Sequence, residues 1–258
     1  MTRVSVLQFE PVLADVDANM AKIRMLIEQS AGSDLYVLPE LASTGYNFAN
    51  RDQAWACSEE IAESRYVDFL EKLCEKHGCY VVSGFNERED NSLFNTALLV
   101  SPEGLGGVYR KLHLFDREKD IFVPGDLGMP VYETPIGTIG MLICYDWMFP
   151  EVWRKMTMAG AQIIAHPCCL VLPYCQQVVP SHAIINRIFV ATANRIGTEG
   201  DLTFTGQSLV VAPDGKVLRR ASVDMEEVLT VDLDLSVALD KMVTPRNHAL
   251  KDRRVELY

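Results

Sequence analysis

Cys144 is the residue in this sequence that best fits a reactive nucleophile, because an apolar run ends there and a polar stretch begins. Residues 140–143 predict a buried strand, and residues 144–151 predict a turn that leads into a helix. A strand fixes the backbone of a cysteine at its end, and nearby backbone N–H groups favour the thiolate, which is the nucleophilic form. A lone cysteine in an apolar run is more often a small core residue, so Cys144 alone does not indicate catalysis.

Two charged residues follow predicted strands in the same way. Glu40 comes after the apolar residues 35–38, and Lys111 comes after residues 107–109. A buried carboxylate or ammonium is costly unless it is paired, and a free thiol is mostly protonated near neutral pH. If the three strands are neighbours, Glu40, Lys111 and Cys144 form a catalytic constellation in which each group supplies what the others lack.

The elements that must position these residues alternate between short β-rich segments and helical patterns. Strands are expected at 4–9, 35–38, 80–84, 93–100, 107–113, 138–143, 163–165, 189–193, 209–212 and 216–219, and helices at 17–29, 66–77, 151–159 and 176–186. Nothing between them resembles a linker or a low-complexity tract. We expect a single domain over residues 1–258, with 244–258 as a C-terminal tail. Two αβ halves, each with a mixed sheet, would pack as an α/β four-layer α-β-β-α sandwich.

Composition limits the partners. The 258 residues are 48% hydrophobic, enough for one large core, and the net charge of −11 with pI near 4.9 disfavours nucleic acid and anionic membranes. No apolar run approaches the roughly 18 residues of a membrane span, and residues 1–6 predict a strand where a signal peptide would stand. Seven cysteines are an odd number for a disulfide scaffold. We therefore expect a cytoplasmic protein with reduced cysteines.

The residues around Glu40, Lys111 and Cys144 resemble, in the same order, the three signature segments of the nitrilase superfamily of carbon-nitrogen hydrolases. The segments are Pro39-Glu40-Leu41, Tyr109-Arg110-Lys111-Leu112-His113-Leu114-Phe115 and Ile143-Cys144-Tyr145-Asp146. The resemblance continues through Asn95-Thr96-Ala97, Phe122-Val123-Pro124-Gly125-Asp126, Phe149-Pro150-Glu151, His166-Pro167, Ala193-Asn194-Arg195-Ile196-Gly197 and residues 206–215. It covers nearly the whole chain and implies the same four-layer fold.

Residue chemistry and the resemblance imply one mechanism, which needs no cofactor. Glu40 is the general base for Cys144, and Cys144 attacks the carbonyl carbon of the substrate. Lys111, with the backbone N–H of Tyr145, holds the oxyanion. Glu40 then protonates the leaving ammonia and activates the water that hydrolyses the acyl-thioester. The resemblance alone adds Glu118 as a second glutamate that positions the lysine and the substrate, since composition favours a solvated charge there.

Other residues near the motifs have weaker assignments. Candidates for lining the substrate pocket are Tyr46, Tyr145, Trp147, His166 and Cys168 to Leu170, although aromatic residues beside a motif are more often core. A zinc site is conceivable from His166, Cys168, Cys169, Cys175 and His182, but adjacent cysteines lack the usual ligand spacing, and we expect no metal. His113 or His166 could pair with Cys144 as in papain. We favour instead a structural role for each histidine, with its hydrogen bonds satisfied by neighbouring groups. His113 lies on the same predicted strand as Lys111.

The substrate class follows from the residues after the nucleophile. Nitrilases proper follow the cysteine with Trp-Glu, whereas Tyr145-Asp146 resembles the amidase branches, which favours an amide over a nitrile. Members of these branches whose substrates bear a carboxylate often have an arginine just after the cysteine motif. This chain has Trp147 and Met148 there, so Arg195 or Arg187 would have to bind such a carboxylate.

We therefore expect hydrolysis of a small neutral amide to a carboxylic acid and ammonia, with an N-carbamoyl-amine as the alternative. From other classes, a soluble acyltransferase that uses the same thioester and an inactive nitrilase-like scaffold stay open. The resemblance also implies a homodimer, in which the tail 244–258 embraces the neighbouring subunit.

Overall fold

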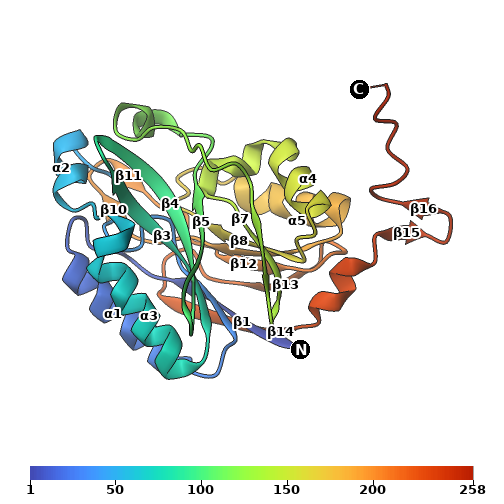
Figure 1. Ribbon diagram of the computed structural model, residues 1–258, viewed down its shortest axis with the longest axis horizontal. Coiled ribbons are helices and arrows are strands. Elements are labelled where there is room, and N and C mark those ends of the chain that lie inside the picture. The colour runs from blue at the N-terminus through green and yellow to red at the C-terminus, as the bar shows by residue number, and fades with distance from the viewer. Residues whose placement is uncertain (258) are drawn as a thin grey trace.

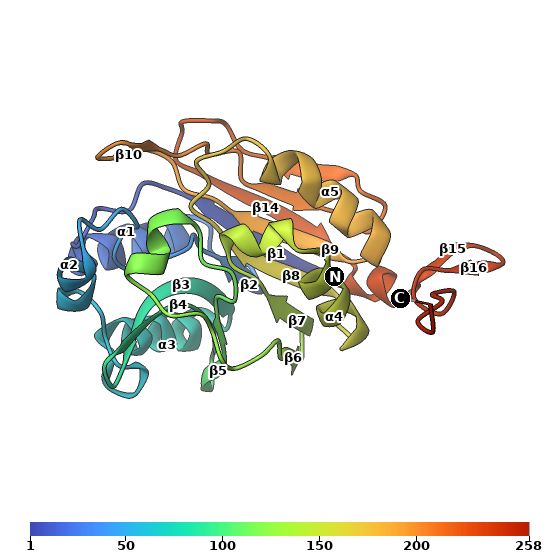
Figure 2. The ribbon, with the colours of Figure 1, turned by 90° about the horizontal axis from the view of Figure 1, so that it is seen from above.

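Two six-stranded sheets lie face to face at the centre of the computed structural model, which describes residues 1–257 (Figures 1 and 2). The first sheet contains, in spatial order, β14 (Glu227–Leu233), β1 (Thr2–Gln8), β2 (Leu35–Val37), β3 (Tyr80–Glu89), β4 (Ser92–Ser101) and β5 (Gly104–Arg110). The second contains β13 (Val217–Arg220), β12 (Leu209–Val211), β9 (Phe189–Ala193), β8 (Ile163–Pro167), β7 (Gly137–Met141) and β6 (Val131–Thr134). Each sheet is mixed, with parallel pairs at its centre and antiparallel pairs at its edges.

Helices cover the outer face of each sheet. The first sheet is covered by α1 (Val16–Gln29) and α3 (Arg65–His77), and the second by α4 (Pro150–Met158) and α5 (Cys175–Asn186) (Figures 1 and 2). The α-β-β-α sandwich expected from the sequence is confirmed.

The alternation of side chains along the strands explains why two sheets can share one core. Leu35 and Val37 of β2 pack between the sheets, whereas Tyr36 between them packs against the helices α1 and α3. Successive side chains of a strand point to opposite faces, so a strand buried on both faces reads as a continuous apolar run. This is the pattern of residues 35–38.

The ends of the outer helices are determined by local hydrogen bonds. The side chain of Asp15 accepts from the Ala18 N–H at the start of α1, and that of Ser64 accepts from the Val67 N–H at the start of α3. α3 ends at Gly78, which adopts φ of 62° in the left-handed region that glycine tolerates. The ends of most predicted helices and strands lie within a few residues of the observed ends.

The prediction that residues 107–113 form one strand is wrong at its end, because β5 stops at Arg110. The Lys111 N–H still donates to the Asn95 carbonyl, but the chain then turns away, and Asp146 accepts from both the backbone N–H and the ring of His113. Lys111 and His113 therefore lie on a loop.

Several short elements have no counterpart in the sequence prediction. They are α2 (Arg51–Ala56), β6, β14, the pairs β10 (Thr198–Glu199) with β11 (Leu202–Thr203) and β15 (Met242–Thr244) with β16 (Asn247–His248), and the 3-10 helices Ile61–Glu63, Asp116–Asp120, Cys144–Met148 and Leu235–Leu239. β14 alternates between buried and exposed residues at the edge of the first sheet, so its apolar signal is weak.

The C-terminal residues project from the sandwich beside β15 and β16 (Figure 1). Val243, Val255 and Leu257 are exposed there. Within residues 1–257, no helix combines the length and the apolar character needed to cross a membrane.

Candidate active site

The three predicted catalytic residues come from both sheets. Glu40 follows β2 and Lys111 follows β5 in the first sheet, with β3 and β4 between those strands, whereas Cys144 follows β7 of the second sheet. The three strands are therefore not neighbours, so the condition set for bringing these residues together is not the one that the fold uses. The residues converge because the segments after the strands fold over the same end of the sandwich.

The segment that carries Glu40 lies directly on β3. The Gly84 N–H donates to the Pro39 carbonyl at 3.1 Å, and a Cβ on Gly84 would lie 2.2 Å from the backbone nitrogen of Leu41. Only a residue without a side chain allows this approach. Gly84 thus helps to fix the position of the Glu40 carboxylate.

Lys111 lies between two buried carboxylates. Its Nζ is 2.7 Å from Oε1 of Glu40 and 2.6 Å from Oε1 of Glu118, and none of the three side chains is appreciably exposed. Burial acts to lower the pKa of Lys111, but Glu118 and Glu40 outweigh it and hold the pKa well above its ordinary value. The site therefore contains a permanently charged ammonium, as an oxyanion requires.

The two oxygens of Glu40 have different surroundings. Oε1 accepts from Lys111 and, at 2.8 Å, from Nδ2 of Asn95. Oε2 is buried and has no hydrogen-bond partner among residues 1–257. A buried carboxylate oxygen left without a donor is costly. It is therefore available to accept a proton during a reaction.

Cys144 occupies a sharp turn at the start of the 3-10 helix Cys144–Met148. Its φ is 41°, an uncommon value for a residue with a side chain, and such backbone conformations occur often at functional sites. Burial, the neighbouring Cys168 thiol and the charge of Glu40 raise the pKa of Cys144 well above its ordinary value. The resting residue is therefore a neutral thiol, so attack on a substrate requires a base.

Asp146 holds this turn in place. Its carboxylate accepts from the Tyr109 hydroxyl at 2.7 Å and from the Ile143 N–H at 3.0 Å, and it lies 2.8 Å from Nδ1 of His113. His113 is therefore engaged by a carboxylate.

His166 is also engaged away from the Cys144 thiol. Its Nε2 is 3.0 Å from the Cys144 carbonyl oxygen and its Nδ1 is 3.2 Å from the Thr192 hydroxyl. Burial lowers the pKa of His166 to about 4, so the ring is neutral and donates its Nε2 proton to that carbonyl. A papain-like pair between Cys144 and either histidine is not supported.

Glu118 is buried, so the alternative of a solvated charge is wrong. Its Oε1 accepts from the Tyr46 hydroxyl at 2.7 Å, and its Oε2 accepts from the Phe115 N–H at 3.0 Å. Burial raises the pKa of Glu118 to about 7, against the opposing effect of Lys111. Tyr46 is therefore connected to Lys111 by their shared partner, Oε1 of Glu118.

A cavity of about 200 Å³ opens onto Cys144. Its lining residues are Phe115, Cys144, Tyr145, Trp147, Met148, Cys169, Leu170, Val171, Leu172 and Tyr174. Of the predicted pocket residues, Tyr145, Trp147, Cys169 and Leu170 belong to this lining. Tyr46 and Glu118 line a smaller neighbouring cavity. His166 and Cys168 line neither cavity; His166 binds the Cys144 carbonyl, and Cys168 lies beside the Cys144 thiol.

The sequence prediction missed Val171, Leu172 and Tyr174 of this lining. These residues follow β8, whose parallel neighbour β7 leads into Cys144. Because parallel strands end at the same edge of a sheet, the apolar run at 169–172 was the signal that could have identified them.

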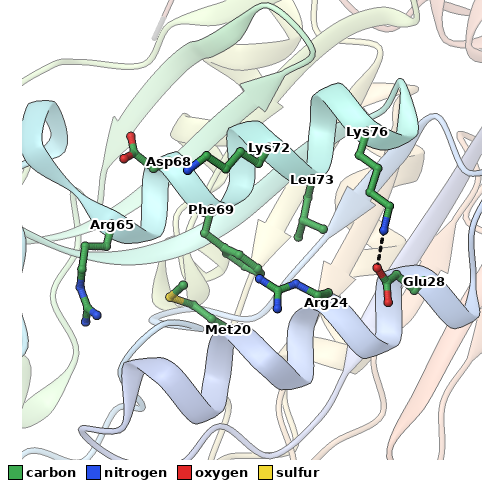
Figure 3. Close-up of a pocket in the computed structure, with 9 residues that line it drawn as sticks. All are labelled: Met20, Arg24, Glu28, Arg65, Asp68, Phe69, Lys72, Leu73 and Lys76. Atoms are coloured by element: carbon green, nitrogen blue, oxygen red, sulfur yellow. Dashed lines mark hydrogen bonds and ion pairs between the residues drawn. The ribbon is translucent and has the colours of Figure 1, made fainter.

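A second cavity, of about 400 Å³, lies between α1 and α3 (Figure 3). Figure 3 shows the ion pair between Lys76 and Glu28 and the position of Arg24 beside Phe69. The Lys76 Nζ lies 2.6 Å from Glu28 Oε1, and the Arg24 Cζ lies 5.2 Å from the centroid of the Phe69 ring. None of its lining residues belongs to the Glu40, Lys111 and Cys144 cluster. The chemistry is therefore assigned to the cavity at Cys144.

Three of the residues that were rejected as metal ligands because of their spacing in the sequence lie close together in the structure. One ligand atom each from His166, Cys168 and Cys175 lies within 4.8 Å of the others, and all three residues are buried. Metal binding needs thiolates and an imidazole nitrogen without its proton. Burial raises the pKa of both thiols, and Nε2 of His166 uses its proton on the Cys144 carbonyl. This arrangement favours a thiol cluster over a metal site.

Comparisons with known proteins identify the family. The carbon-nitrogen hydrolase family model matches residues 3–239. A nitrilase of Pyrococcus abyssi is 40% identical over 260 residues, covering 100% of this chain and 99% of its own. The N-carbamoylputrescine amidase of Arabidopsis thaliana is 28% identical, over 99% of this chain and 93% of its own.

A solved amidase from Nesterenkonia sp. superposes with a TM-score of 0.82 at 28% identity, covering 99% of this chain and 94% of the other. Together with the geometry at Cys144, these matches place the chain in the nitrilase superfamily, and it belongs to the carbon-nitrogen hydrolase family.

Proposed function

We propose that this enzyme hydrolyses a small neutral amide to a carboxylic acid and ammonia through an acyl-thioester on Cys144. The observation that carries the proposal is the buried Lys111 held between Glu40 and Glu118, with one oxygen of Glu40 left without a partner. A neutral thiol, a free carboxylate oxygen and a fixed cation are the groups that covalent amide hydrolysis requires.

In the first half-reaction Glu40 takes the Cys144 proton as sulfur attacks the carbonyl carbon. The oxyanion is stabilised by Lys111 and by the backbone N–H of Tyr145, which lies in the first turn of a 3-10 helix, where N–H groups have no intrahelical acceptor. Glu40 returns the proton to the leaving nitrogen. In the second half-reaction Glu40 activates a water that hydrolyses the thioester.

The cavity supports a neutral substrate. Its lining contains no charged side chain, and neither arginine suggested for a carboxylate belongs to it. Arg195 is buried and paired with Glu199. A carboxylate or an ammonium in this cavity would lose hydration without gaining a partner, which disfavours charged substrates.

The substrate panel that tests this proposal compares neutral aliphatic and aromatic amides with N-carbamoyl amines and with amides that bear a carboxylate. We expect ammonia and the matching acid from the neutral amides, at higher kcat/KM than from the N-carbamoyl amines or from the amides that bear a carboxylate. Preference for an N-carbamoyl amine would support the alternative, a reaction that depends on an added amine or alcohol would indicate an acyltransferase, and no release from any substrate would indicate a scaffold.

We further propose a homodimer in the cytoplasm, with no nucleic acid or membrane partner. Met158 on α4 and Ile184 and Ile185 on α5 are exposed, as are Val255 and Leu257 of the tail, and such apolar surface is suited to an interface. Light scattering should give twice the chain mass, with closed two-fold symmetry as the commonest arrangement. A fully active monomer would contradict the dimer, and a truncation after Val243 that stays dimeric would contradict only the role of the tail.

A further inference from the structure

Three buried cysteines form a continuous row that begins at the proposed nucleophile. Cys144 is 4% exposed, and Cys168 and Cys175 are 0% exposed. Cys168 is the middle member: its sulfur lies within 4.8 Å of the Cys175 sulfur on one side, and on the other its thiol interacts with the Cys144 thiol at the matching ends of the parallel strands β7 and β8. Cys144 is the member of the row that lines the cavity, so small reagents reach the row through Cys144.

The backbone around the row is fixed. His166 binds the Cys144 carbonyl at 3.0 Å and lies 3.3 Å from the Cys168 sulfur, while the Cys168 N–H donates to the Ala193 carbonyl at 2.8 Å. Cys169, the next residue, is directed elsewhere, because its thiol donates to the Glu40 carbonyl at 3.2 Å. Adjacent positions therefore offer two buried thiols, of which Cys168 contacts the Cys144 thiol.

We propose that Cys168 is a resolving cysteine that protects Cys144 from irreversible oxidation by hydroperoxides. Glu40 takes the Cys144 proton as the sulfur attacks the terminal peroxide oxygen, the O–O bond breaks, and the leaving oxygen receives that proton and departs as an alcohol or water, while Cys144 becomes a sulfenic acid in a two-electron oxidation. Cys168 sulfur then attacks Cys144 sulfur, and the S–O bond breaks. The hydroxide leaves with the Cys168 proton as water, and a Cys144–Cys168 disulfide remains.

This disulfide is reversible, whereas a sulfenic acid with no thiol beside it proceeds to sulfinic acid, which is not. A reducing dithiol would return both thiols by exchange and be oxidised itself. Cys175 extends the row, since exchange can move the disulfide to Cys168 and Cys175 and free Cys144. The inference rests on the proposed nucleophile, but its product can be identified without any assay of amide hydrolysis.

The test treats the enzyme with hydrogen peroxide and maps disulfides by non-reducing peptide mass spectrometry. Mapping is needed because Cys74 and Cys79 form another pair of neighbouring buried thiols. In the Cys175→Ala variant, where exchange is impossible, we expect a linked Cys144–Cys168 peptide pair. Finding Cys144 with two or three added oxygens and no such pair would overturn the proposal.

A second readout measures how much of each variant's own activity a dithiol restores after peroxide treatment. We expect wild type and Cys169→Ala to recover, and Cys168→Ala to lose the recoverable fraction as sulfinic acid accumulates on Cys144. Cys169→Ala is the matched control, since it removes an adjacent buried thiol that is directed to the Glu40 carbonyl. Recovery of Cys168→Ala to the wild-type level would overturn the proposal. If no variant hydrolyses amides, the proposed function fails, and the peptide map still decides this inference.

Discussion

Replacement of Cys144 with alanine is expected to reduce amide hydrolysis by a factor on the order of 10⁴ to 10⁶, because it removes the thiol that we propose forms the acyl-enzyme. The fold should persist. Loss of one small buried side chain costs about 1 kcal/mol, and the turn keeps the backbone contacts made through Asp146 and His166. The measurements are ammonia release, intact mass after mixing with substrate, and the melting temperature.

Cys169→Ala is the matched control for this variant. Cys169 is equally buried and lines the same cavity, but its thiol donates to the Glu40 carbonyl. It should therefore keep a measurable acyl adduct on Cys144. Ammonia release at the wild-type rate by a folded Cys144→Ala protein would show that the nucleophile lies elsewhere.

The layers could be predicted from the sequence, and the residues that we propose as a triad could be selected from it, because each rests on a local pattern. Apolar alternation indicates strands, as at residues 35–38, and a polar residue directly after such a run indicates the edge of a sheet, as at Glu40 and Cys144. Glu118 had no such local signal. It lies in a charged run, and its burial depends on Lys111 and Tyr46, which the loops bring to it.

Contacts between residues that lie far apart in the sequence could not be predicted from it. Cys144 and Cys168 are neighbours only because β7 and β8 are parallel and end at the same edge, and Glu40 Oε2 lacks a partner only because Lys111 and Asn95 both bind Oε1. Neither fact follows from spacing, because each depends on the orientation of side chains that are far apart in sequence. The order of the strands had the same limit, because β3 and β4 lie between β2 and β5.

Lys111→Met tests the oxyanion contact, and it should lower kcat/KM by a factor on the order of 10² to 10³ or more, the usual effect of removing one oxyanion donor. The variant also leaves Glu40 and Glu118 buried without their shared cation, a change that costs about 3–5 kcal/mol when one partner of a buried ion pair is removed. A fall in melting temperature is therefore expected. If the variant does not fold, the conclusion rests on Glu40→Gln.

Glu40→Gln tests the base with little change in shape. An amide carbonyl can still accept from Lys111 and Asn95, but the amide nitrogen then occupies the place of Oε2 and cannot accept the Cys144 proton. Turnover should fall by a factor on the order of 10² to 10⁴, the usual contribution of a general base, and the acyl adduct should disappear. Turnover and acylation at the wild-type rate would show that the base is another residue.

The pH dependence of Cys144 alkylation in Glu40→Gln separates loss of the base from loss of the nucleophile. Because burial is the largest cause that raises the pKa of Cys144 above its ordinary value of 9.0, the thiol in this variant should stay protonated near neutral pH. The thiolate fraction then grows as pH rises, so the rate with iodoacetamide should be low at pH 7 and still increase above pH 9. A rate that is already constant from neutral pH would mean that a thiolate exists without Glu40, and Glu40 would then be a positioning residue for Lys111 rather than the base.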